Sequence, residues 1–175
     1  MTSEITRRAA LSLVGAGTTV FLSACAATNV FVGTQEDASS PSASPKDYKG
    51  EAKLEEYDTS AGTFEPATHD TPPKNVPKPI KPKNADEDSV AGLYSSIAFL
   101  GAAITYALLT GEVGPVNESA LNEENRENFT SGLTLDKIRE GKYWEAEPKA
   151  VFFLETSEPT KEGDEYIWPH KLESR

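Results

Sequence analysis

The most regular pattern of apolar positions in the chain lies between Asp86 and Glu112. Apolar residues recur there every three or four positions, as on one face of an α-helix: Val90, Leu93, Tyr94, Ile97, Leu100, Ile104, Ala107 and Leu108. Acidic residues precede this run and Gly111 follows it, as expected at the two ends of a helix. The pattern therefore predicts a helix close to residues 86–112 that buries one face.

The same segment allows a second interpretation, because residues 91–109 carry no charge. A transmembrane helix needs about twenty predominantly apolar residues. Here Ser95, Ser96 and Thr105 dilute the run, and small residues such as Gly101 suit close packing against other elements. We expect a helix inside a folded domain, with a membrane span as the alternative.

Shorter elements follow this helix. Residues 117–129 and 133–140 predict two short surface helices. Beyond Gly141 the chain is rich in aromatic and β-branched residues, which favours strands, and we expect 151–155 and 165–168 to pair as a hairpin. Helices followed by strands predict an α+β fold. In it a long N-terminal helix and short helices pack on a small curved antiparallel sheet.

Large apolar residues are scarce between residues 26 and 84, which hold eight of the twelve prolines. Such a segment buries too little surface to offset the entropy of ordering. The chain is therefore predicted to consist of a signal peptide (1–24), a lipidated cysteine with a disordered Pro/Lys-rich tether (25–84) and a small α+β domain (85–175). Four residues of the tether can form a short docking element: Tyr48, Leu54, Tyr57 and Phe64.

The only cysteine, Cys25, directly follows an apolar run that ends in Leu22, Ser23 and Ala24. These four residues resemble the lipobox of bacterial lipoproteins, which implies that Cys25 is diacylated and becomes the mature N-terminus. Each buried methylene contributes about 0.8 kcal/mol, so two acyl chains hold a protein in the membrane. We expect a protein anchored on the extracytoplasmic face of the cell membrane.

The export signal is completed by Arg7 and Arg8, which precede the apolar run. Residues 6–11 partly resemble the twin-arginine signal, which would imply folding before export. General secretion with an ordinary basic leader is the alternative.

Charge and composition exclude several functions. The formal net charge is −11, which disfavours nucleic acid and anionic lipid surfaces as partners. The two histidines, His69 and His170, are far apart in the sequence and cannot form a zinc site without further ligands. Glu145 and Glu147 can pair on a strand, but acid–base catalysis needs one carboxylate buried. We expect no catalytic residue, metal site or cofactor.

Aromatic residues offer the better candidate for binding. Most must form the core of so small a domain. Phe152 and Phe153 are adjacent, so in a strand they face opposite sides and one can line a partner surface. The candidate binding surface comprises Trp144, Phe152, Phe153, Tyr166 and Trp168.

The phrase "YALLTGEVGPV", with Tyr106-Ala107 and Thr110-Gly111-Glu112, resembles a family of actinobacterial lipoproteins of unknown function. That family is related to the nuclear-transport-factor-2-like cone folds, and the resemblance extends from about Pro77 to the end of the chain. We expect a lipoprotein that carries a binding or interaction domain for an envelope protein or a small apolar ligand. An enzyme of the ketosteroid-isomerase type, with a carboxylate in an apolar pocket, and a structural envelope protein are the alternatives.

Overall fold

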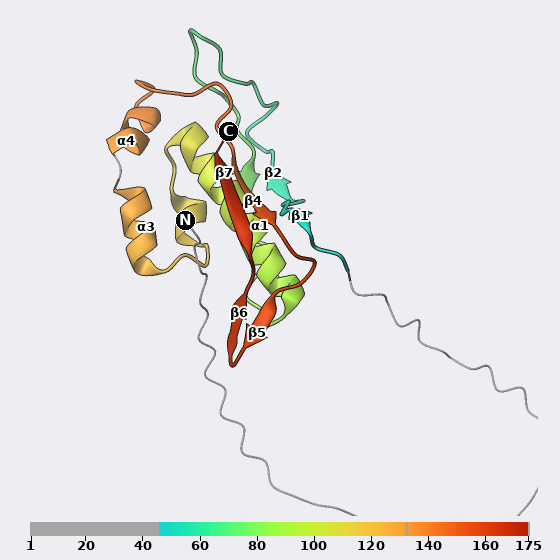
Figure 1. Ribbon diagram of the computed structural model, residues 1–175. Coiled ribbons are helices and arrows are strands. Elements are labelled where there is room, and N and C mark those ends of the chain that lie inside the picture. The colour runs from blue at the N-terminus through green and yellow to red at the C-terminus, as the bar shows by residue number, and fades with distance from the viewer. Residues whose placement is uncertain (1–45, 132, 175) are drawn as a thin grey trace, which may run out of the picture.

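The computed structural model describes residues 46–131 and 133–174, and its centre is the 21-residue helix α1, Val90–Thr110 (Figure 1). The side chain of Ser89 caps the helix by accepting a hydrogen bond from the Gly92 amide at 3.0 Å. Gly111 ends it in the left-handed region, with φ of 76°. A Cβ atom at Gly111 would lie 2.6 Å from the backbone of Leu135 and Arg139, so only glycine fits this position.

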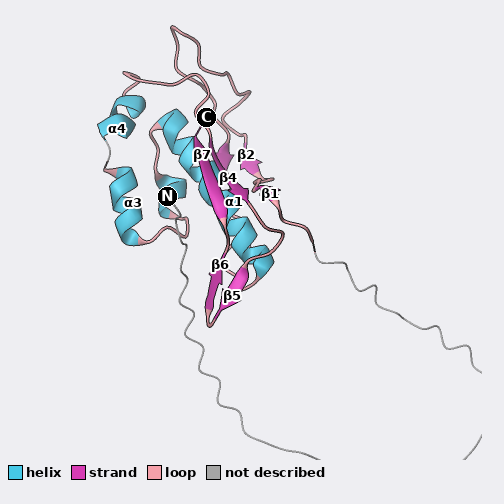
Figure 2. Ribbon diagram, in the orientation of Figure 1, coloured by secondary structure: helices cyan, strands magenta, loops and turns pink. Residues whose placement is uncertain are grey.

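Three short helices follow α1 and lie to one side of it (Figure 2). They are α2, Gly114–Asn117, α3, Glu123–Thr130, and α4, Leu133–Arg139. Asn122 caps α3 by accepting a hydrogen bond from the Asn125 amide at 2.8 Å. The two short helices predicted after α1 correspond to α3 and α4, whereas the single turn of α2 was not predicted.

The main sheet has three antiparallel strands in the order β1-β4-β7. They are β1, Gly50–Glu51, β4, Ala150–Leu154, and β7, His170–Ser174. Strand β4 is central and packs against α1. Phe152 lies opposite Leu172 of β7, and Phe153 lies opposite Lys171. The α+β class predicted from the sequence is confirmed.

The predicted pairing of 151–155 with 165–168 is wrong. The second of these segments contains β6, Glu165–Ile167, which pairs with β5, Thr160–Glu162, around the turn at Gly163. Strand β4 pairs instead with β7, which a local hairpin rule cannot find because β5 and β6 lie between the two strands in sequence. The long helix was also expected to be the first element of the domain. This is not confirmed, because short strands precede it in the chain.

Residues 46–84 belong to the fold, so the predicted disordered tether is wrong for this part of the chain. Besides β1, the segment forms the pair β2, Tyr57–Asp58, and β3, Lys78–Pro79. The centre of the Tyr48 ring lies 4.7 Å from that of the Tyr94 ring, which is tilted by 38°, and 5.9 Å from that of the Trp168 ring, which it meets edge-on. These contacts with distant residues supply the burial that the local composition lacks.

The predicted signal and lipobox lie outside the described residues: Arg7, Arg8, Leu22, Ser23, Ala24 and Cys25.

Two clusters of buried side chains run along α1. The sheet cluster joins the first part of the helix to the sheet and comprises Leu93, Ile97, Leu100, Phe152, Leu154 and Trp168. The helical cluster joins the last part of α1 to α2 and α4 and comprises Ala103, Ala107, Val116, Leu135 and Ile138.

Helix α1 is long and apolar enough to cross a membrane by length and composition alone. That is weak evidence, because the core helix of a soluble domain passes the same test. Here 56% of its most apolar stretch is buried by the rest of the fold. Its burial in the two clusters accounts for its apolar composition.

Candidate functional site

The strongest candidate for a binding site is an apolar groove of about 560 Å³ between α1, β4 and the N-terminal segment. We call it the aromatic groove. Small residues of α1, namely Ala98, Gly101 and Ala102, line it on the helix side and leave room above the helix. Residues 51–54, Tyr57 and residues 76–77 form another wall, and residues 149–151 close the β4 side. Ligand sites for small molecules commonly have this size and apolar character.

Three aromatic rings line the groove, namely Tyr57, Phe64 and Tyr106. Tyr57 is 41% exposed and Phe64 is 42% exposed, so both rings keep surface available for contact. Partial burial raises the pKa of the Tyr57 hydroxyl. Burial also raises the pKa of Tyr106, and the nearby Glu112 carboxylate adds to the effect. Both phenols therefore stay protonated at neutral pH and can donate a hydrogen bond.

Two polar groups of the aromatic groove, the Glu51 carboxylate and the Thr105 hydroxyl, already have partners within the protein. The Glu51 carboxylate lies 2.8 Å from the Lys149 Nζ and 3.9 Å from the Lys53 Nζ. Thr105 Oγ1 donates to the Gly101 carbonyl at 2.9 Å and accepts from the Ala150 amide at 3.0 Å. Glu51 is the only carboxylate among the lining residues, and a carboxylate paired with two ammonium groups is a poor general base. The groove is therefore suited to binding an apolar group rather than to abstracting a proton.

A second groove of about 550 Å³ shares the lining residues Lys53, Leu54 and Ala98 with the aromatic groove. It holds four lysines, at positions 46, 53, 81 and 83. The Lys46 Nζ lies 5.2 Å from the centre of the Tyr48 ring and 5.8 Å from that of Tyr94, and Lys81 forms an ion pair with Asp86 at 2.7 Å. Two carboxylates, Glu55 and Glu56, also line this groove and offset its positive charge.

The five aromatic residues predicted as a binding surface do not form one surface. Phe152 and Trp168 are each 6% exposed in the sheet cluster, and Tyr166 packs against that cluster. The Trp168 Nε1 donates to the Thr156 carbonyl at 3.0 Å, as a buried indole requires. Their size and apolar character are used for packing.

The other two predicted aromatic residues lie elsewhere. Phe153 points away from the sheet cluster and is 40% exposed. The Trp144 Nε1 donates to the Thr68 carbonyl at 2.9 Å and so holds a loop of the N-terminal segment. Two of the three rings that line the aromatic groove, Tyr57 and Phe64, belong to the short docking element expected within the predicted tether. Their aromatic character in a polar segment is the signal that could have identified them.

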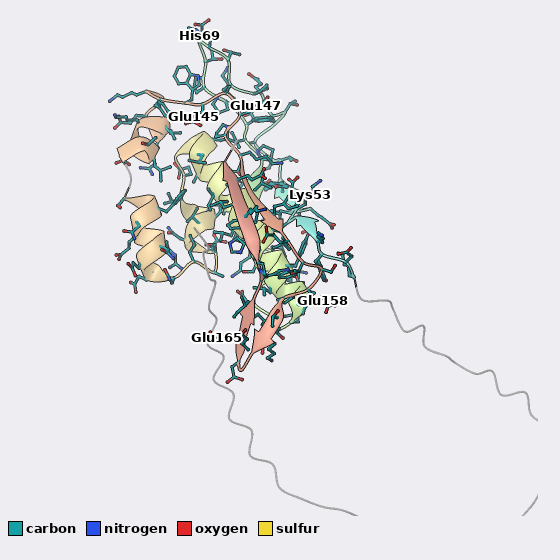
Figure 3. All side chains as sticks on the ribbon, viewed as in Figure 1. Lys53, His69, Glu145, Glu147, Glu158 and Glu165 are labelled. Atoms are coloured by element: carbon teal, nitrogen blue, oxygen red, sulfur yellow. The ribbon has the colours of Figure 1, made fainter. Side chains whose placement is uncertain are left out.

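The remaining candidates for chemistry lie apart on the surface (Figure 3). His69 occupies an exposed loop tip, with its Nδ1 2.8 Å from Asp70. Glu145 lies at the same end of the molecule as Glu147 and accepts a hydrogen bond from the Tyr143 hydroxyl at 2.6 Å. Among the residues that the structure describes, no group of three or more His, Cys, Asp or Glu side chains could hold a metal ion.

These observations define the class of protein. It is a small α+β domain with an open apolar groove beside its central helix. The sequence matches the family of unknown function DUF6318 over residues 62–175, and the chain belongs to that family. No curated protein and no solved structure matches the chain. The matched region begins at residue 62, so the family unit includes part of the predicted tether, in agreement with its place in the fold.

Proposed function

We propose that this protein is a lipid-anchored extracytoplasmic lipoprotein whose α+β domain binds a small apolar ligand in the aromatic groove. The observation that carries the proposal is the groove itself, with two half-exposed aromatic rings beside a helix surface of small residues. An apolar ligand would remove both rings from water. Full burial of such a side chain contributes about 1.5–3 kcal/mol, and the ligand gains the share of this that belongs to the 41% of Tyr57 and 42% of Phe64 still exposed.

The location part of the proposal rests on the sequence from Leu22 to Cys25 and on the resemblance to actinobacterial lipoproteins. A likeness to the nuclear-transport-factor-2-like folds belongs to the same proposal, and a helix packed on one face of an antiparallel sheet supports it. An anchor at residue 25 would leave about twenty residues before the described fold begins at residue 46. The groove would then face the aqueous space outside the membrane.

The binding proposal can be tested with an uncharged apolar fluorophore, N-phenyl-1-naphthylamine, and a chain that begins at residue 26. This chain contains every described residue. We expect saturable fluorescence enhancement, which Phe64→Ala weakens by about tenfold because the ligand then meets one aromatic ring fewer. Phe153→Ala is the matched control, since Phe153 is 40% exposed compared with 42% for Phe64 but does not line the groove.

Equal weakening by the two variants, or no saturable binding at all, would contradict a site in this groove. Thermal melting of each variant checks that both remain folded. Phe64 is half-exposed, so its removal should leave the melting temperature almost unchanged.

The anchor is tested separately by Cys25→Ser in the native host. We expect the protein to leave the membrane fraction, because the acyl chains are attached through the sulfur atom. Continued sedimentation with membranes would show that another part of the chain holds it there.

A further inference from the structure

Strand β7 forms one edge of the main sheet, because the strand order is β1-β4-β7. Its five residues pair with β4 on one side only. Among the described residues, no other strand pairs with its outer side. Unpaired edges of this kind are templates for the addition of another strand.

The backbone of Leu172 is directed toward the open side of β7. In an antiparallel ladder each residue sends its N–H and C=O groups to the same neighbour, and the direction alternates along the strand. The Phe152 carbonyl accepts a hydrogen bond from the Ala52 amide at 2.9 Å, so the Phe152 backbone is directed toward β1. Leu172 lies opposite Phe152, and its own backbone groups therefore point away from β4.

The side chain of Leu172 is the most exposed large apolar group in the described part of the chain, at 56%. Because it lies opposite Phe152, it shares the sheet face that carries the sheet cluster. Leu172 thus extends the apolar face of the sheet to its edge, but it is not itself part of the sheet cluster. A further strand beside β7 would bury this side chain next to existing core residues.

Residues of opposite charge flank Leu172, with Lys171 before it and Glu173 after it. If two β7 strands pair antiparallel with Leu172 opposite Leu172, each Lys171 lies opposite the Glu173 of the other copy. Lysine on an edge normally discourages pairing. Lys171 already pairs with Glu155 of its own chain at 2.8 Å, and the symmetric arrangement adds the Glu173 of the other copy opposite each Lys171.

We propose that two copies of this chain associate through antiparallel pairing of their β7 strands, centred on Leu172, to form a continuous six-stranded sheet. The two-fold axis repeats every favourable contact. Leu172 forms the hydrogen-bonded central pair, and the Lys171–Glu173 pairs occupy the neighbouring positions where cross-strand side chains lie closest. The charge order favours this register, because only here does each Lys171 lie opposite a Glu173, whereas the net charge of −11 opposes association in every register. The pairing is independent of ligand binding in the aromatic groove.

Sedimentation velocity of the full-length chain carrying Cys25→Ser tests this proposal, because that substitution removes the lipid attachment. We expect a concentration-dependent shift from monomer to dimer. Leu172→Pro should abolish the dimer, since proline removes an outward N–H while the bonds to β4 remain. Glu173→Lys should weaken the dimer about tenfold, because it places lysine opposite lysine twice.

The double variant Lys171→Glu/Glu173→Lys restores opposite charges in the same register and should recover the dimer. Lys161→Glu on β5 is the control for a change in net charge and should leave association unaltered. Circular dichroism melting establishes that each variant is folded. A parent chain that stays monomeric at about 1 mM overturns the proposal. A folded double variant that remains as weak as Glu173→Lys also overturns it.

Discussion

The two buried clusters along α1 differ in the size of the side chains that the helix contributes. The sheet cluster receives Leu93, Ile97 and Leu100 from α1, whereas the helical cluster receives Ala103 and Ala107. Large side chains fill the space between a helix and a sheet, while alanines let other helices approach closely. One helix therefore supports two kinds of packing because its residue sizes change along its length.

The two clusters also differ in how their partners are held. Strand β4 is the central strand of the sheet, and Leu154 within it is fully buried. Helix α4 has seven residues and lies at the outside of the fold. A cavity in the helical cluster can therefore be reduced by movement of a short outer element. The sheet cluster has less freedom to adjust, and this difference sets the order of the effects expected below.

The largest effect is expected for Leu154→Ala in the sheet cluster. The substitution leaves a cavity beside a central strand that cannot close around it, so the free energy of unfolding should fall by about 2–5 kcal/mol. Ile138→Ala in the helical cluster is the comparison and should cost less, because α4 can move inward. Urea denaturation followed by circular dichroism measures both. A greater loss for Ile138→Ala would reverse the proposed order of rigidity.

An intermediate effect is expected for Ala107→Leu, which adds volume to the helical cluster. Ala107 is fully buried where α1 packs on other helices, so overpacking should lower the free energy of unfolding by about 1–3 kcal/mol. Ala91→Leu, at an exposed position of the same helix, is the matched control and should change it by less than about 0.5 kcal/mol. Similar unfolding midpoints for the two variants would mean that close helix contact is not required there.

The smallest effect is expected from the polar contacts at the margin of each cluster. Arg139 Nη2 donates to the Gly111 carbonyl at 2.7 Å and so holds α4 at the end of α1. Arg139→Met should cost about 1 kcal/mol. The margin of the sheet cluster carries the ion pair Glu155–Lys171, 2.8 Å long and exposed, and Glu155→Gln should have no measurable effect in thermal melting.

The Glu155–Lys171 ion pair also predicts how stability depends on pH. The hydrogen bond from Lys171 holds the pKa of Glu155 below its ordinary value. Any contribution to stability is therefore present above the ordinary pKa and lost as the pH falls through the lowered one. We therefore expect Glu155→Gln to lose less stability at neutral pH than Arg139→Met. An equal loss in the two variants would contradict this order of the two polar contacts.

Much of the helical structure could be predicted from local sequence. Apolar spacing and terminal signals located α1, and short capped segments located α3 and α4. The pairing of strands could not be obtained this way. Strand β4 has partners about 100 residues before it and 20 after it, and β1 is only two residues long. Such a strand carries no alternation that a local pattern can detect.

The candidate site was predicted only in part for the same reason. Tyr57 and Phe64 stood out as aromatic residues in a polar segment, but nothing local placed them beside Gly101 of α1. Conversely, Trp168 and Phe152 were candidates for a surface and are buried. Aromatic residues serve either role, and only the packing partners distinguish the two.

The sequence by itself located the helices and predicts a lipid anchor at Cys25, because both inferences depend on residues within a few positions of one another. Tertiary structure alone decided that residues 46–84 are ordered, where the aromatic groove lies and which edge of the sheet is open. The physical reason is that a segment poor in apolar residues cannot offset its conformational entropy alone. It becomes ordered when Tyr48 and its neighbours pack on a helix and sheet that other parts of the chain supply.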